Sequence, residues 1–241
     1  MEISRSFGRA PQEIRPVTLE RDVMKHALGS CFVKFGDTHV LCSATIDEHV
    51  PAWLKGKNQG WVTAEYAMLP ASTSVRSRRE INGQKGRSQE IQRLIGRSLR
   101  TVCDLQHFGE ISVTLDCDVI QADGGTRTAS ITGAWVALHD ALMKWVEAGR
   151  LARLPLNNQV VALSVGMVDG VLVSDLDYSE DSVAEIDMNL VYTSKHEFIE
   201  IQGTGERVSF SRQKLNDLLD IAQPGLLHLL ELQNKEVDFF D

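Results

Sequence analysis

Cysteine is scarce in this sequence, and no two cysteines have a spacing that suggests a shared function. The four cysteines are Cys31, Cys42, Cys103 and Cys117. They form no C-x-x-C pair, and no histidine lies at the spacing of a zinc site. We therefore expect buried free thiols, which are typical of a protein from a reducing compartment.

Long hydrophobic runs and several common motifs are also missing. No stretch approaches the roughly 20 apolar residues of a membrane helix, and the N-terminus lacks the apolar core of a signal peptide. We expect a cytoplasmic protein with no membrane partner. The sequence contains no G-x-G-x-x-G, no G-x-x-x-x-G-K and no G-x-S-x-G, so the commonest nucleotide folds and serine acyl transfer gain no support.

Basic residues are fewer than acidic residues, but they are concentrated in one region. The formal net charge of -8 argues against simple electrostatic adhesion to nucleic acid or membrane. Between positions 76 and 100, however, the bases outnumber the acids; they are Arg76, Arg78, Arg79, Lys85, Arg87, Arg93, Arg97 and Arg100, against Glu80 and Glu90. Such a basic island favours a focused site for a polyanion, although an arginine-rich loop is often only solvated.

The order of hydrophobic patterns predicts strands and helices in one large domain or two packed ones. The expected strands cover residues 17–19, 30–35, 38–45, 61–68, 111–120, 160–168, 171–175, 190–193 and 197–201. The expected helices begin near Arg87, Arg127 and Ser211. Ser88 is a plausible N-cap of the first. On this helix Arg93, Arg97 and Arg100 share one flank, which either lines a groove or is a solvated face.

A polar, glycine-bearing turn at residues 121–130 separates an alternating strand from a helix. Unpaired backbone N–H groups and the helix dipole favour a bound anion at such a helix start. Gly124 and Gly125 permit a close approach of the backbone, Thr126 offers a hydroxyl, and Arg127 can grip a phosphate with two donors. The alternative is an ordinary turn that binds nothing.

Acidic residues crowd the stretch 175–189. Six carboxylates lie within thirteen residues, and they repel one another unless a cation or arginine compensates. Oxygen-rich clusters suit Mg²⁺ or Mn²⁺, whereas the alternative is a solvated acidic loop. A phosphate cradle, a second arginine at a helix start (Arg87) and a metal-binding carboxylate group are together what phosphoryl transfer requires.

Motifs spread over nearly the whole chain resemble those of the bacterial ribonuclease PH family of phosphorolytic 3'-to-5' exoribonucleases. They are Gly8-Arg9, Ile14-Arg15-Pro16-Val17, Phe35-Gly36-Asp37-Thr38, Trp53–Gly56, Gly60–Tyr66, Gln89–Arg97, Leu115–Gly133, Asp175–Tyr178, Glu180-Asp181 and Asp187-Met188-Asn189. The run 121–133 is highly specific. The chain departs from the family pattern at Ala71, where members commonly carry arginine.

The resemblance implies an α+β fold like domain 2 of ribosomal protein S5, with two β-sheet/helix halves packed around a common core. It implies a single domain over residues 1–241, with pseudo-related halves at roughly 1–110 and 111–241. It also implies a homohexamer built as a trimer of dimers.

The resemblance further implies which residues act. The expected phosphate ligands are Arg87, Gly125, Thr126 and Arg127, the expected ligands of Mg²⁺ or Mn²⁺ are Asp181 and Asp187, and the expected catalytic residues are Arg127 and Asp181. Asp181 is also expected to assist proton transfer to the departing 3'-oxygen. Inorganic phosphate would attack the last phosphodiester of the RNA and release a nucleoside 5'-diphosphate, in a reaction that can run backwards.

The basic island would then contact the RNA. The expected RNA-binding residues are Arg76, Arg78, Arg79, Arg93 and Arg97, which would line a ring channel for the single-stranded 3' ends of tRNA precursors and other RNAs. Three alternatives stay open: a non-catalytic ring subunit of the exosome type, a small-molecule kinase, and the larger polynucleotide phosphorylase. The sequence contains no ATP-binding motif, which a kinase would require, and no second core of the kind found in polynucleotide phosphorylase.

Overall fold

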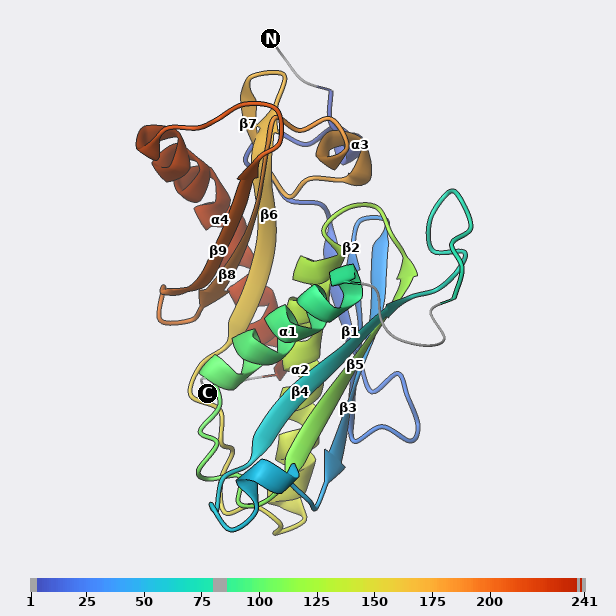
Figure 1. Ribbon diagram of the computed structural model, residues 1–241, viewed down its shortest axis with the longest axis vertical. Coiled ribbons are helices and arrows are strands. Elements are labelled where there is room, and N and C mark those ends of the chain that lie inside the picture. Colours follow the sequence, from blue (N-terminus) through green and yellow to red (C-terminus); the bar gives the residue numbers. More distant parts are fainter. Residues whose placement is uncertain (1–3, 80–85, 238, 240–241) are drawn as a thin grey trace.

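Two β-sheets and three long helices make up the fold in a computed structural model, which describes residues 4–79, 86–237 and 239 (Figure 1). The larger sheet has the order β1-β2-β3-β5-β4. Its strands are β1 (Val17–Arg21), β2 (Gly29–Phe35), β3 (Thr38–Asp47), β4 (Trp61–Met68) and β5 (Ser112–Gln121). All its pairs are antiparallel except β4 with β5, which are parallel and connected through α1 (Gly86–Thr101).

The smaller sheet is antiparallel throughout, in the order β7-β6-β8-β9. Its strands are β6 (Val160–Val168), β7 (Val171–Ser174), β8 (Ile186–Thr193) and β9 (Phe198–Gly205). The short helix α3 (Tyr178–Asp181) lies in the connection from β7 to β8. Two 3-10 turns, Ser6–Gly8 and Ala52–Leu54, complete the regular structure of the described chain.

Helix α2 (Thr126–Glu147) is the centre of the core. It packs against β2 and β3 of the larger sheet and against β6 of the smaller one, while α1 covers β4 beside it. The alternating side chains of β5 bury Val113, Leu115, Cys117 and Val119 beneath these helices. Helix α4 (Arg212–Val237) packs on β6 and β7 (Figure 1). No helix among the described residues has the length and apolar character needed to cross a membrane.

The predicted fold class is confirmed, and the predicted elements are all present with shifted ends. The four cysteines are buried and unpaired, as expected. Two details were wrong. Helix α1 already begins at Gly86, so Ser88 lies in its first turn and does not cap it. Strand β8 begins at Ile186, so Asp187 lies on a strand, not in an acidic loop.

The division of the chain near residue 110 stays a prediction. The strand that follows this position, β5, pairs with β3 and β4 in the larger sheet. Both sheets contribute to the core around α2, and their adjoining ends frame the site described next.

Candidate functional site

The glycine turn between β5 and α2 has the backbone that a left-handed conformation requires. Gly124 has φ +74° and Gly125 has φ +64°, a region that favours glycine. A Cβ on Gly124 would lie 2.6 Å from the carbonyl carbon of Asp177, so no larger residue fits. Gly125 is the N-cap of α2 and provides no side-chain cap. The first N–H groups of a long helix are therefore left for another acceptor.

All six residues expected to bind phosphate or metal face one cavity in front of this turn. The cavity has a volume of about 610 Å³, and its walls include Arg87, Gly125, Thr126, Arg127, Asp181 and Asp187. They come from the first turns of α1 and α2, from the end of α3 and from the start of β8. The structure thus brings together residues from four elements, of which α1 and α2 pack on the larger sheet and β8 belongs to the smaller one.

A second hollow of about 520 Å³ continues the first toward β9. The two share Arg87, Arg127, Asp181, Asp187 and Asn189. Arg87, Arg127, Asp181 and Asp187 consequently stand on the boundary between a mixed apolar and polar chamber and an almost wholly polar one, whereas Gly125 and Thr126 line only the first.

The cavity arginine of α2 is held in place by two neighbours. Arg127 donates through Nη1 to Gln202 Oε1 at 2.7 Å and to Glu90 Oε1 at 3.3 Å. Gln202 also donates to Glu90 at 3.1 Å, which closes the triangle. Beside it, the hydroxyl of Thr126 contacts that of Tyr66 at 2.8 Å. Nothing in the sequence indicated a role for Gln202 or Tyr66.

The two cavity carboxylates are electrostatically strained in the protein alone. Burial raises the pKa of Asp187 to about 6, and repulsion from Asp181 adds to the shift against the opposing effect of Arg127. Burial also raises the pKa of Asp181, although Arg87 and Arg127 oppose the rise. Both carboxylates therefore lack enough positive charge nearby, which is the condition a bound cation would relieve.

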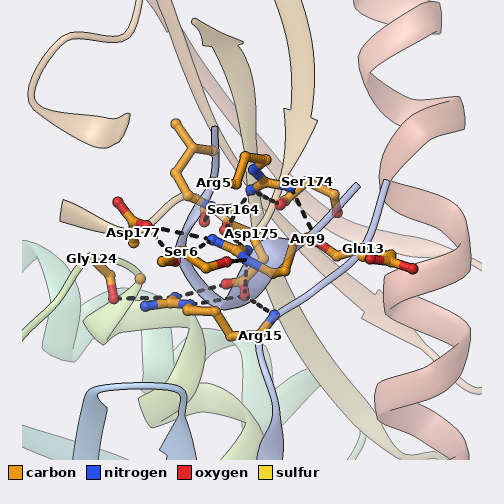
Figure 2. A network of polar contacts seen from close by, with 12 residues as sticks. Arg5, Ser6, Arg9, Glu13, Arg15, Gly124, Ser164, Ser174, Asp175 and Asp177 are labelled. Atoms are coloured by element: carbon orange, nitrogen blue, oxygen red, sulfur yellow. Dashed lines mark hydrogen bonds and ion pairs between the residues drawn. The ribbon is translucent and has the colours of Figure 1, made fainter. Parts of the chain in front are cut away.

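The rest of the acidic stretch has a different partner from the one expected. Asp175, Asp177 and Glu180 do not face the expected cation site but are buried against arginines from the N-terminal segment. Figure 2 shows Arg9 and Arg15 at Asp175. Arg5 binds Glu180 at 2.6 Å, and Arg9 contacts all three carboxylates at 3.4–3.5 Å. Among the described residues no group of three or more His, Cys, Asp or Glu is placed to hold a metal, so Asp181 and Asp187 would act as a pair.

The expected RNA-binding arginines lie outside the cavity walls. Arg76, Arg78 and Arg79 are exposed in the segment that follows β4, and Arg93 is exposed on α1. Arg97 is ion-paired with Glu200 of β9. Arg100, for which a groove and a solvated face were both left open, stacks on Trp61 at 4.3 Å and donates to Val62 O. Glu80 and Lys85 of the basic island lie outside the described residues.

Several residues around the cavity gave no functional signal in the sequence. Ser164 lies in the apolar run of β6, yet it lines the cavity and accepts a hydrogen bond from Leu176 N at 3.0 Å. Arg15 and Thr38 belong to recognisable motifs, but nothing in their spacing indicates that they meet behind the glycine turn. They contact its carbonyl groups directly.

Comparison with known proteins gives matches over almost the whole chain. The model of the 3' exoribonuclease family, domain 1, matches residues 13–144, and that of domain 2 matches residues 158–225. Ribonuclease PH of Brucella ovis is 56% identical over 237 residues, which cover 97% of this chain and 99% of that protein. Ribonuclease PH of Brucella canis gives the same values.

Solved structures share the fold at much lower identity. The crystal structure of rice (Oryza sativa) Rrp46 superposes with a TM-score of 0.78 at 18% identity, covering 97% of this chain and 100% of that one. The Archaeoglobus fulgidus exosome with RNA bound to the active site gives a TM-score of 0.80 at 22% identity, covering 95% and 92%. At these identities the likeness shows the fold alone.

Proposed function

The chain belongs to the 3' exoribonuclease family, and from that premise we propose that it is a phosphorolytic exoribonuclease that trims the 3' ends of tRNA precursors. Inorganic phosphate, not water, is the nucleophile. Each cycle breaks the bond between the last phosphorus and the 3'-oxygen of the preceding nucleotide and forms a phosphoanhydride. The products are a nucleoside 5'-diphosphate and an RNA shorter by one nucleotide.

The observation that carries this proposal is the convergence of two arginines and an uncapped helix start on one cavity. Arg87 and Arg127 supply positive charge, and Gly125 and Thr126 present the start of α2. Each is a recognised donor for phosphate oxygens. Their positions on different elements suit an anion that must be held in one orientation before it attacks.

The carboxylates Asp181 and Asp187 fit a hard divalent cation, Mg²⁺ or Mn²⁺, because they are paired, oxygen-bearing and undercompensated in charge. When bound, such an ion would neutralise charge on the phosphate oxygens of the reacting groups. We also propose that Asp181 assists proton transfer to the departing 3'-oxygen. The reaction exchanges a phosphoester for a phosphoanhydride of comparable energy, so excess diphosphate drives nucleotide addition.

RNA beyond the last nucleotide would be held by the arginines outside the cavity. These are Arg76, Arg78, Arg79, Arg93 and Arg97. The local positive charge compensates for a net charge of -8 where the phosphate backbone approaches. We place the reaction in the cytoplasm and in a homohexamer, a trimer of dimers, in which these arginines would line the path of a single strand.

The experiment that tests this function uses a tRNA with extra 3' nucleotides, Mg²⁺, and buffer with or without inorganic phosphate. Phosphate-dependent release of nucleoside diphosphates is expected. Arg127→Ala should reduce release by about 100-fold or more while RNA binding persists, because it removes an anchor of the nucleophile. Arg212→Ala, at the exposed start of α4, is the control and should behave as wild type.

Two outcomes would contradict the proposal. Release of nucleoside monophosphates without phosphate would mean hydrolysis. Retained RNA binding with no release by the wild-type protein would favour a non-catalytic ring subunit, a reading that the joint presence of Arg87, Thr126, Arg127, Asp181 and Asp187 opposes.

A further inference from the structure

The carbonyl groups of the glycine turn are fixed from behind, on the side away from the cavity. Arg15 donates through Nη1 to Asp123 O at 2.5 Å and through Nη2 to Gly124 O at 3.5 Å. Thr38 donates through Oγ1 to Gly124 O at 2.6 Å and accepts from Asp123 N at 3.0 Å. Two consecutive peptide groups are therefore held by two buried side chains (Figure 2 shows Arg15 at Gly124).

Fixing these carbonyls also fixes the N–H groups that follow them. A trans peptide is planar, and its C=O and N–H point in opposite directions. With Asp123 O and Gly124 O bound behind the turn, the N–H groups of Gly124 and Gly125 are directed to the opposite side. Both glycines line the cavity. Within the described parts of the chain, neither N–H has a protein acceptor.

Arg15 is rigidly held by the smaller sheet. Its Nε and Nη2 bind the two carboxylate oxygens of Asp175 at 2.9 and 2.7 Å, and its backbone N–H binds Oδ2 at 2.7 Å. Both side chains are fully buried. A Cβ on Gly125 would lie 3.1 Å from Arg15 Nη2, so the guanidinium lies directly against the turn.

Glycine has the widest range of backbone conformations, so the orientation of the Gly124 and Gly125 peptide groups depends on such contacts. From these contacts we propose that Arg15 and Thr38 are positioning residues that hold the Gly124 and Gly125 N–H groups toward the inorganic phosphate. Neither side chain touches the phosphate. This inference rests on the proposed function, since it assumes that phosphate occupies the cavity in front of the turn.

The test measures phosphorolysis by the full-length protein at varied phosphate concentration and saturating RNA. Thr38→Val keeps the shape of the side chain but removes all three hydrogen bonds of its hydroxyl, which donates to Gly124 O and accepts from Asp123 N and from Arg15 Nη1. The KM for phosphate is expected to rise about tenfold, while the KM for RNA and the kcat at saturating phosphate change little. Thr38→Ser keeps the hydroxyl and should restore a wild-type KM.

A control variant tests whether a loss of stability by itself raises the KM for phosphate. Leu142→Ala creates a core cavity on α2, about 24 Å along the helix from its start. It should lower the melting temperature without changing the KM for phosphate. If Thr38→Val does not fold, Arg15→Lys replaces it, because lysine keeps the charge but cannot span Asp175 and both carbonyls.

The outcomes separate this inference from the proposed function. A wild-type KM for phosphate in Thr38→Val or its replacement, or an equal rise in Leu142→Ala, would overturn the inference and leave phosphorolysis intact. A wild-type protein that releases no diphosphates in the same assay would overturn the proposed function, and the inference with it.

Discussion

At the scale of single residues, the cavity keeps two carboxylates under conditions that oppose their ionisation. Asp187 is half-buried at the start of β8, and Asp181 repels it. Arg87 and Arg127 reduce this repulsion only in part. A functional site that holds unfavourable charge in this way is expected to cost folding stability.

We predict that Asp187→Asn stabilises the metal-free protein at neutral pH. The pKa of Asp187 is raised to about 6, whereas the same group in the unfolded chain ionises near 3.8. Between these pH values the folded protein keeps a proton that the unfolded chain has lost, so its stability falls as the pH rises. The substitution should add about 1 kcal/mol or more at pH 7, hence roughly 2–4 °C in melting temperature, and nothing at pH 3.5.

Thermal melts at the two pH values measure this effect, with exposed Asp220→Asn as the control. Mg²⁺ should raise the melting temperature of the wild type but not of Asp187→Asn. Equal stability of both proteins at pH 7 would show that the carboxylate is not strained, and equal stabilisation by Mg²⁺ would remove Asp187 from the metal site.

The position of a residue at the cavity could be predicted where a motif places it next to a helix start, as for Arg87 and Arg127. Arg15 could not be predicted in the same way. Its burial depends on Asp175, which follows it by 160 positions and lies directly after β7 of the smaller sheet. Composition assigned Asp175 to a possible cation cluster, because a sequence does not show that an arginine is the compensating charge.

At the scale of elements, α2 approaches the larger sheet closely enough to require glycine. A Cβ on Gly29 of β2 would lie 2.0 Å from Ala137 O and 2.7 Å from Ala141 N. A Cβ on Gly133 of α2 would lie 2.5 Å from a methyl carbon of Val33. Helix α2, whose start faces the cavity, therefore packs on the larger sheet in close contact with its backbone.

We predict that Gly29→Ala destabilises the protein by at least about 3 kcal/mol, because the added methyl group meets backbone atoms that cannot rotate away. Chemical denaturation measures the change. Gly86→Ala, at the first position of α1 with no atom of the described residues within 4 Å of the added Cβ, is the matched control and should be neutral or slightly stabilising. An unchanged stability of Gly29→Ala would contradict the close contact between β2 and α2.

Most strands and helices could be predicted from the alternating or helical spacing of their apolar residues, because one face of each is buried. The start of β8 was not. Ile186 and Met188 alternate with Asp187 and Asn189, but the polar pair continued an acidic stretch and so resembled a loop. The polar residues of this strand face the cavity, where function overrides the usual pattern.

At the scale of the whole molecule, the proposed ring is testable without any assay of activity. Six copies would have a mass of about six times 26.8 kDa. Sedimentation velocity at micromolar concentration is expected to give this species, and a monomer would contradict the ring. Exposed apolar side chains such as Trp53, Phe198 and Ile201 leave apolar surface available for contacts between copies.

The sequence predicted the α+β class and the assembly through its resemblance to a family, not through its composition. An acidic chain with one basic island does not by itself indicate RNA. The meeting of the two sheets at one cavity depends on contacts between residues more than 100 positions apart, such as Arg15 with Asp123 and Asp175. Such contacts are fixed by the folded chain as a whole.

The most direct test of phosphorolysis follows the phosphate itself. The protein is incubated with an RNA that carries extra 3' nucleotides, Mg²⁺ and radiolabelled inorganic phosphate, and the released nucleotides are separated. The account predicts nucleoside 5'-diphosphates with one labelled phosphate at the β position for each nucleotide removed. Unlabelled nucleoside monophosphates would show that water is the nucleophile and would contradict the role assigned to the glycine turn, Arg87 and Arg127.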